Sequence, residues 1–420
     1  MKRIWLWVLI LMNTSFTAAA ESKVAEIKTG NFSAGVSSAV ITPVAHNDVV
    51  ETLASGSKTV GDISDPLYAK SLILSDDNSR IALIALDLGY IHPTAYAELL
   101  AALRSQFSFD QVFLSITHTH SGYVGNYDYK ALKEKIVSAT EAALTTMEPV
   151  KIGASEGQLD EAYNRIIRKP GGSAEMLWTN PQRVSNRRVD QSVGVINIKK
   201  QNGDTLANIV NYSAHPVVTM DLNNVVISAD YPGQLASSLK RRGEGETLFL
   251  LGAAGDVNPY EADTKPTAVA LKKSNELGEK LADEVMKTLA DITQYQARGR
   301  FSFSNQGYSL PVVKASDLDV APAEVNTLIL TDTIALASFS GEFFNQFGVR
   351  LKQKSPVKHT FFVGYTNGSL GYVPTREAMQ YGGYGADLKD LWIDASAGER
   401  QLNDAIESLE ALYRSRSTAP

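Results

Sequence analysis

The chain has 420 residues, no cysteine and a formal net charge of -6 at pH 7. The lack of cysteine excludes disulfides, thiolate metal ligands and a cysteine nucleophile, so any metal would be held by histidine, carboxylate, tyrosine or backbone oxygen. The mildly acidic balance indicates neither a nucleic-acid partner nor an anionic membrane surface as a partner.

The N-terminus has the pattern of a secretory signal peptide. Two basic residues precede an apolar run over residues 4–12, and an alanine triplet that ends at Ala20 offers a cleavage site. This pattern predicts a signal peptide over residues 1–20, and a buried N-terminal helix is the alternative. No later stretch approaches the roughly 20 apolar residues of a membrane-spanning helix. We therefore expect an exported chain, residues 21–420, that is periplasmic or secreted and has no transmembrane segment.

Predicted helices and strands alternate along the rest of the chain. Apolar residues at helical spacing predict helices, and short apolar runs bounded by turn residues predict strands. In chain order these are a hairpin of 72–74 and 80–86, a helix over 93–107, a strand over 112–116, a helix over 130–147, strands over 193–198, 209–212 and 247–251, and helices over 269–292 and 399–414. The alternation predicts an α/β fold in a single domain, with β-sheets flanked by helices.

Two stretches of the sequence resemble each other. The run Leu72-Ile-Leu-Ser-Asp with Ile81-Ala-Leu is similar to Leu328-Ile-Leu-Thr-Asp with Ile334-Ala-Leu. In each case a predicted helix, a strand and a loop that contains Gly-Tyr-Val follow. Two related halves could each contribute ligands to a shared cleft. A chance likeness between two apolar hairpins is the alternative.

The segment Thr117-His-Thr-His-Ser-Gly follows the predicted strand 112–116. In an extended chain, residues two apart point to the same side, so His118 and His120 can face one metal, or one metal and one substrate. Two ordinary polar histidines at a strand end are the alternative. His46, His92 and His359 have no comparable setting.

Three further segments carry candidate site residues after predicted strands. His215 follows strand 209–212, and active sites of open α/β sheets gather at the carboxyl ends of strands. Asn258 lies in a Gly-Asp-Val-Asn-Pro segment after strand 247–251, where glycine lets the backbone approach a ligand. Glu342 follows the second hairpin and opens an apolar helix. Each segment taken alone has a simpler explanation. His215 could be an ordinary loop histidine, the Asn258 segment a tight turn, and Glu342 a carboxylate that complements a helix dipole.

Taken in order, five motifs resemble the catalytic domain of the neutral ceramidases. They are THTHSG, SAHP, GDVNP, SGEF and GYVPTRE, and the likeness extends over about residues 32–400. The family implies a hydrolase with a single zinc ion. Matching motif to motif implies four zinc ligands, namely His118, His215, Glu342 and Tyr372.

The resemblance also implies roles for residues around the metal. His120 would face the substrate and move a proton, while Arg165 and Tyr384, together with Asn258, would stabilise the oxyanion. This chain has Asn258 where the family usually has serine, and an amide side chain is not a nucleophile. We also expect no C-terminal immunoglobulin-like domain of the kind that the ceramidases carry. Because of these two differences, the resemblance supports ceramide as the substrate less strongly than it supports metal-dependent hydrolysis.

The combined prediction is a zinc-dependent hydrolase that cleaves an N-acyl amide bond in a small-molecule or lipid-like acylated substrate. Zinc with an open coordination position activates water for attack on a carbonyl group. One alternative is a zinc esterase or deacylase that acts on a non-sphingolipid substrate. A non-catalytic cell-envelope binding protein of the same fold is the other alternative.

Overall fold

The structure is a computed structural model that describes residues 29–42, 49–52, 56–122, 128–184, 188–220, 225–262, 267–314 and 318–417. The predicted signal peptide lies outside these residues. Over the described ranges, no helix combines the length and the apolar character that crossing a membrane requires.

The strands fall into two large sheets and several short pairs. The larger sheet contains β2 (Ser33–Val40), β5 (Tyr68–Ser75), β6 (Arg80–Leu86), β7 (Gln111–Ile116), β8 (Glu148–Gln158), β12 (Ser192–Lys200), β13 (Thr205–Tyr212) and β15 (Glu246–Leu251). The smaller sheet contains β18 (Ser302–Pro311), β19 (Val320–Thr331), β20 (Ile334–Phe339) and β22 (His359–Val363). Short strands pair as β1 (Gly30–Asn31) with β17 (Arg298–Gly299), β3 (Val49–Thr52) and β14 (Val225–Ile227) with β4 (Gly56–Ile63), β9 (Ala162–Asn164) with β16 (Val257–Pro259), β10 (Ile166–Arg168) with β11 (Ala174–Met176), and β21 (Glu342–Phe343) with β23 (Tyr372–Val373).

The α-helices are α1 (Pro93–Gln106), α2 (Tyr129–Thr145), α3 (Asp230–Arg241), α4 (Thr267–Ala290), α5 (Asn345–Lys354), α6 (Arg376–Tyr381) and α7 (Ser396–Ser417). The α/β prediction is confirmed, and the predicted elements differ from the observed ones only at their ends. The helix predicted to reach residue 147 ends at Thr145, since β8 already begins at Glu148 ahead of Pro149. The helix predicted to reach Phe107 ends at Gln106, where the backbone becomes extended.

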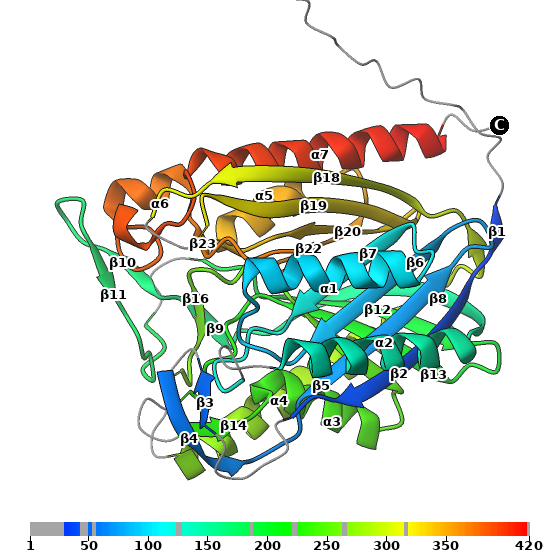
Figure 1. The fold of residues 1–420 in the computed structure, drawn as a ribbon, viewed down its shortest axis with the longest axis horizontal. Helices are drawn as coiled ribbons and strands as arrows, with labels where there is room; N and C mark the ends of the chain where they lie inside the picture. Colours follow the sequence, from blue (N-terminus) through cyan, green and yellow to red (C-terminus); the bar gives the residue numbers. More distant parts are fainter. Residues whose placement is uncertain are drawn as a thin grey trace, which may run out of the picture.

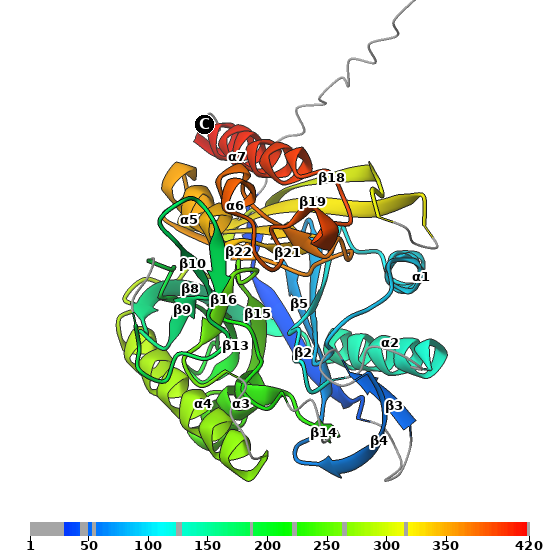
Figure 2. The same ribbon diagram turned by 90° about the vertical axis from the view of Figure 1, so that its left-hand side faces the viewer.

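The elements form four layers, with two sheets face to face and helices outside them (Figures 1 and 2). Side chains of both sheets, among them Leu72, Ile196, Leu328 and Phe361, share one apolar core. Apolar residues of α1, α2, α3 and α4 pack on the outer face of the larger sheet, and those of α5 and α7 pack on the smaller sheet. Burial between the sheets therefore joins them into one body.

The two similar stretches of sequence have the same topology. In the first, β2, β5 and β6 are antiparallel neighbours, α1 follows, and β7 pairs in parallel with β6. In the second, β18, β19 and β20 are antiparallel, α5 follows, and β22 pairs in parallel with β20. The same order recurs in β8, β12, β13, α3 and β15, a third unit that the sequence comparison did not reveal.

The third and fourth strands of each unit are parallel, so their carboxyl ends point in one direction. The unit that begins with β2 and the unit that begins with β8 are joined edge to edge, because these two strands pair. The unit of the smaller sheet lies across the shared core. The loops that follow these strands meet at one place, which positions the candidate site.

Candidate metal centre

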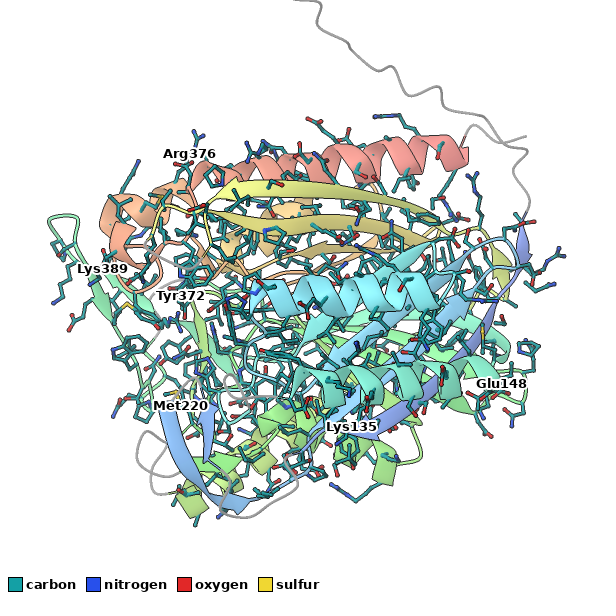
Figure 3. All side chains as sticks on the ribbon, in the orientation of Figure 1. Lys135, Glu148, Met220, Tyr372, Arg376 and Lys389 are labelled. Carbon is teal, nitrogen blue, oxygen red and sulfur yellow. The ribbon has the colours of Figure 1, made fainter. Side chains whose placement is uncertain are left out.

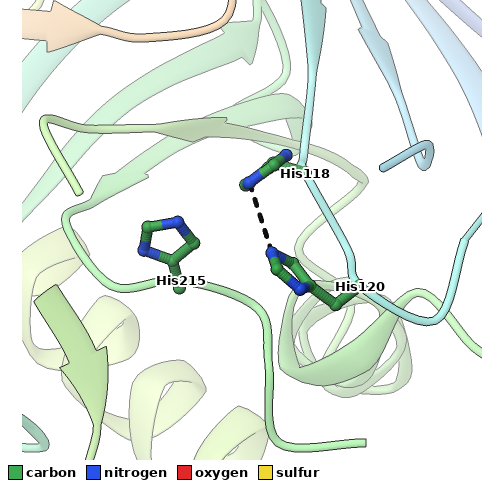
Figure 4. Close-up of side chains that lie close together, drawn as sticks. All are labelled: His118, His120 and His215. Atoms are coloured by element: carbon green, nitrogen blue, oxygen red, sulfur yellow. Dashed lines mark hydrogen bonds between the residues drawn. The ribbon is translucent and has the colours of Figure 1, made fainter. Parts of the chain in front are cut away.

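Three histidines from two units lie together. His118 is the second residue after β7, and His215 is the third residue after β13. The ligand atoms of His118, His120 and His215 all lie within 4.8 Å of one another, and Figure 4 shows their rings around a common point. The Nε2 atoms of His118 and His120 are 3.3 Å apart. His118 and His215 are buried, while His120 is partly exposed.

Glu342 adds a carboxylate from the remaining unit, which contains β18, β19, β20 and β22. Its Oε2 lies 3.2 Å from His215 Nε2 and 3.7 Å from His118 Nε2. Contrary to the sequence prediction, Glu342 does not open the following helix; it belongs to β21, which pairs with β23, and α5 begins only at Asn345. Two ligands of a tetrahedral zinc site are about 3.3 Å apart, so these separations fit a shared metal ion.

Hydrogen bonds set the tautomers of two of the histidines. His118 Nδ1 lies 2.6 Å from the carbonyl oxygen of Gly89, and His215 Nδ1 lies 3.1 Å from that of Val257. Because a carbonyl oxygen only accepts, both rings carry a proton on Nδ1, and in the neutral form of each ring the Nε2 lone pair points toward the centre. A carbonyl partner of this kind commonly orients a metal-bound histidine.

The charge states suit a cation. Burial lowers the pKa of His215 to about 4 and also lowers the pKa of His120, so both rings are neutral at pH 7. Burial alone would raise the pKa of Glu342, but its interactions with His118 and His215 outweigh burial and hold that pKa below its ordinary value. Neutral imidazoles and an ionised carboxylate are the forms that bind zinc. The residues present therefore fit a metal ion.

Arg165 lies beside this centre and is held by neighbouring polar groups. Its Nη1 donates to Asn258 Oδ1 at 3.2 Å, and its Nη2 donates to the carbonyl oxygen of Gly255 at 2.7 Å. Asn258 also hydrogen-bonds the hydroxyl of Tyr163, which itself donates to the carbonyl oxygen of Leu177. Both ends of the Asn258 side chain are thus engaged within the protein.

Aromatic rings surround the Arg165 guanidinium. The ring centres of Trp178, Tyr372 and Tyr384 lie 5.6, 5.4 and 5.2 Å from it. Tyr372 is opposite Glu342 in the β21–β23 pair, and Figure 3 shows it at the end of the molecule where α6 lies. Burial raises the pKa of the Tyr372 hydroxyl. Tyr384 is 44% exposed and Trp178 is 46% exposed, so these two rings line the solvent side of the site.

The structure also brings in residues that the motifs did not indicate. The Tyr365 hydroxyl lies 2.8 Å from His118 Nε2. The Asp256 carboxylate accepts hydrogen bonds from the Asn164 amide and from the backbone N–H of Asn345, and so ties β9 and α5 to the GDVNP segment. Tyr365 could have been found from the internal repeat, because it follows β22 at the same distance at which His118 follows β7.

The other histidines lie elsewhere. His92 caps the start of α1, and His359 pairs with Glu156 at 3.1 Å. His46 falls outside the described residues. Over the described part of the chain, His118, His120 and His215 form the cluster of metal-ligating groups.

Together the fold and the site define an α/β protein with a buried centre of histidines and a carboxylate that can hold a metal ion. The family model described as neutral/alkaline non-lysosomal ceramidase, N-terminal, matches residues 32–275, more than half of the chain. The chain therefore belongs to the neutral/alkaline non-lysosomal ceramidase family, and this membership makes it a hydrolase by family.

Solved ceramidases have the same fold. The neutral ceramidase from Pseudomonas aeruginosa is 16% identical, with a TM-score of 0.75, and the match covers 91% of this chain and 75% of that one. A ceramidase complexed with C2 is also 16% identical, with a TM-score of 0.75, and the match covers 91% of this chain and 76% of that one. At this identity the likeness establishes the architecture, while the chemistry has to be argued from the residues of this chain.

Proposed function

We propose that this protein is a zinc-dependent hydrolase that cleaves an N-acyl amide bond in a lipid-like or small acylated substrate. One observation carries the proposal. In a member of the ceramidase family, the Nε2 atoms of His118 and His215 and the Oε2 atom of Glu342 converge with separations suited to one metal ion. Zinc, when bound there, would activate water and polarise the scissile carbonyl.

The protein groups have distinct tasks in this proposal. His118, His215 and Glu342 hold the metal, and their carbonyl and imidazole partners fix their orientation. Tyr372 is the fourth ligand implied by the family motif, and its pairing with Glu342 across β21 and β23 brings it to the same side of the site.

His120 is the proposed proton carrier. Its ring is neutral at pH 7 because burial lowers its pKa, and its Nδ1 is buried without a hydrogen-bond partner among the described residues. A neutral imidazole can accept a proton from water and pass it to the leaving amine. Its Nε2 also lies close enough to His118 for metal ligation, so the role of His120 has to be tested separately from that of His118.

Arg165 and Tyr384 are the proposed oxyanion donors. The guanidinium is buried, and its Nε has no hydrogen-bond partner among the described residues, which leaves one donor for a substrate. Donors placed in advance beside a developing negative charge contribute a few kcal/mol to catalysis. Asn258 supports this role by holding Arg165, since its own side chain is engaged at both ends.

The test is hydrolysis by purified protein reconstituted with zinc. N-acyl amides of graded acyl length and matched esters would be assayed with His215→Ala as the inactive control. We expect amide cleavage that a chelator abolishes and that added zinc restores. Cleavage of esters alone would identify an esterase, and a zinc-loaded protein that cleaves neither would contradict the proposed amide hydrolysis.

A further inference from the structure

The internal repeat predicts which residues enter the metal centre. His118 is the second residue after β7, and Tyr365 is the second residue after β22, the corresponding strand of another unit. Both have backbone φ angles in the left-handed region, 63° and 47°. His215 and Glu342 are likewise the third residues after the corresponding strands β13 and β20. Tyr365 therefore occupies a position that supplies a metal ligand in another unit.

Contacts hold Tyr365 rigidly against His118. Its ring stacks on the His118 imidazole with centroids 4.0 Å apart and an interplanar angle of 22°. Its carbonyl oxygen accepts hydrogen bonds from the Ile116 N–H and from the Tyr96 hydroxyl. Residues that keep positive φ angles outside glycine are usually held by such surroundings, which is the case here.

The direction of the hydrogen bond between the two residues follows from the Gly89 contact. Nδ1 of His118 donates to the Gly89 carbonyl oxygen, so in the neutral ring Nε2 can only accept. With the neutral ring, the Tyr365 hydroxyl, 2.8 Å away, is the donor. It engages the same lone pair that a metal ion would use.

We propose that Tyr365 is a positioning residue of the metal centre, whose hydroxyl holds the Nε2 lone pair of His118 in the metal-free protein and is displaced when zinc binds. This inference rests on the proposed metal site and adds a residue that no family motif indicates. The Tyr365 ring, stacked on the His118 imidazole, keeps the imidazole in place both before and after zinc replaces the hydroxyl at Nε2. The hydroxyl is the nearer of two partners of this buried Nε2 atom, at 2.8 Å against 3.3 Å for His120 Nε2.

Two substitutions separate the ring from the hydroxyl. Tyr365→Phe keeps the stacked ring and removes the competing hydrogen bond, so zinc should bind about 2- to 10-fold more tightly. Tyr365→Leu also removes the ring, so zinc should bind more weakly than in Tyr365→Phe. Tyr308→Phe is the matched control, since its hydroxyl donates to Asp404 on another part of the molecule, and it should leave zinc affinity unchanged. Zinc affinity would be measured by competition with a chromophoric chelator.

The visible spectrum of the cobalt-substituted protein distinguishes a displaced hydroxyl from a ligand. We expect Tyr365→Phe to leave this spectrum unchanged, because the ligand set is the same. A changed spectrum, or zinc binding that is unchanged or weaker in Tyr365→Phe, would overturn the proposal.

A second measurement needs no metal and so remains informative if the proposed function fails. In the metal-free wild type, the ¹⁵N chemical shifts of His118 should show a protonated Nδ1 and a hydrogen-bonded, unprotonated Nε2. The Nε2 shift should move in Tyr365→Phe and stay in place in Tyr308→Phe. A wild-type spectrum with the proton on Nε2 would refute the proposal, whatever the protein hydrolyses.

Discussion

At the metal centre, His118 and His120 lie close together but have different proposed tasks. His118→Ala and His215→Ala should lose zinc while keeping the fold, because each removes a ligand. His120→Ala should keep zinc and lower turnover by roughly 10²–10⁴-fold, because it removes a proton carrier. Zinc content, circular dichroism and activity of the three variants decide the matter. Zinc loss in His120→Ala with retention in His118→Ala would reverse the assignment.

The proposed support of Arg165 by Asn258 can be tested by substitution. In Asn258→Ser the shorter side chain cannot span Arg165 and Tyr163 together, so one of the two loses a partner. A lost hydrogen bond of this kind costs about 1 kcal/mol, so kcat/KM should fall by roughly tenfold or less, with zinc content unchanged. In Asn258→Ala both partners lose their hydrogen bond to this side chain, so kcat/KM should fall further. Mass spectrometry of quenched wild-type reactions should find no acyl group on residue 258; an adduct there would contradict the metal mechanism.

The buried imidazole of His215 makes the metal-free protein sensitive to acid. Its pKa is about 4 in the folded protein and about 6.5 when exposed, so the unfolded chain binds more protons between these values. The stability from this group is complete above pH 6.5 and is lost as the pH falls toward 4. Relative to His215→Gln, which does not titrate, the wild type should lose up to about 3 kcal/mol over this window. Urea unfolding in chelator at several pH values measures the difference, and parallel pH profiles for the two proteins would refute it.

At the scale of elements, the close approach of the two sheets can be tested at Gly194. A Cβ atom there would lie 2.3 Å from the ring of Phe361, so β12 and β22 meet without room for a methyl group. Gly194→Ala should lower the free energy of unfolding by about 1–3 kcal/mol, as overpacking does. Gly307→Ala in β18 is the control, because no atom lies within 4 Å of its Cβ position. Equal stability of the two variants would show that the sheets are packed less tightly than described.

Several elements could be predicted because their apolar patterns are local. The β5–β6 hairpin, α1 and α4 each show the required periodicity within their own residues. The short pairs β9–β16 and β21–β23 could not be predicted, since each pairs segments far apart in the chain over two or three residues. These short pairs place Asn258 beside Tyr163 and Glu342 beside Tyr372, so elements too small to predict arrange much of the site.

For the whole molecule, a metal ion at this centre would connect the two sheets. His118 and His215 follow strands of the larger sheet, and Glu342 follows a strand of the smaller one. Zinc at a free concentration about 100 times its Kd should stabilise the fold by about 2.7 kcal/mol. Calorimetry should show one unfolding transition that zinc moves to higher temperature in the wild type and leaves in place in His215→Ala. Two transitions, of which zinc moves only one, would show that the sheets unfold separately.

The sequence by itself determined the α/β class, several of the helices and strands, and the family, because apolar periodicity and short ordered motifs are local properties of the chain. It also indicated the repeat in two of its three places. The third unit was not visible, because a buried strand needs apolar residues rather than particular ones and its sequence can diverge while its topology persists. Only the tertiary structure decided that Tyr365 reaches His118, that Asn258 is engaged at both ends, and that Glu342 lies in a strand rather than at a helix start. Each of these depends on contacts between segments distant in the sequence, whose geometry is set by the packing of the two sheets.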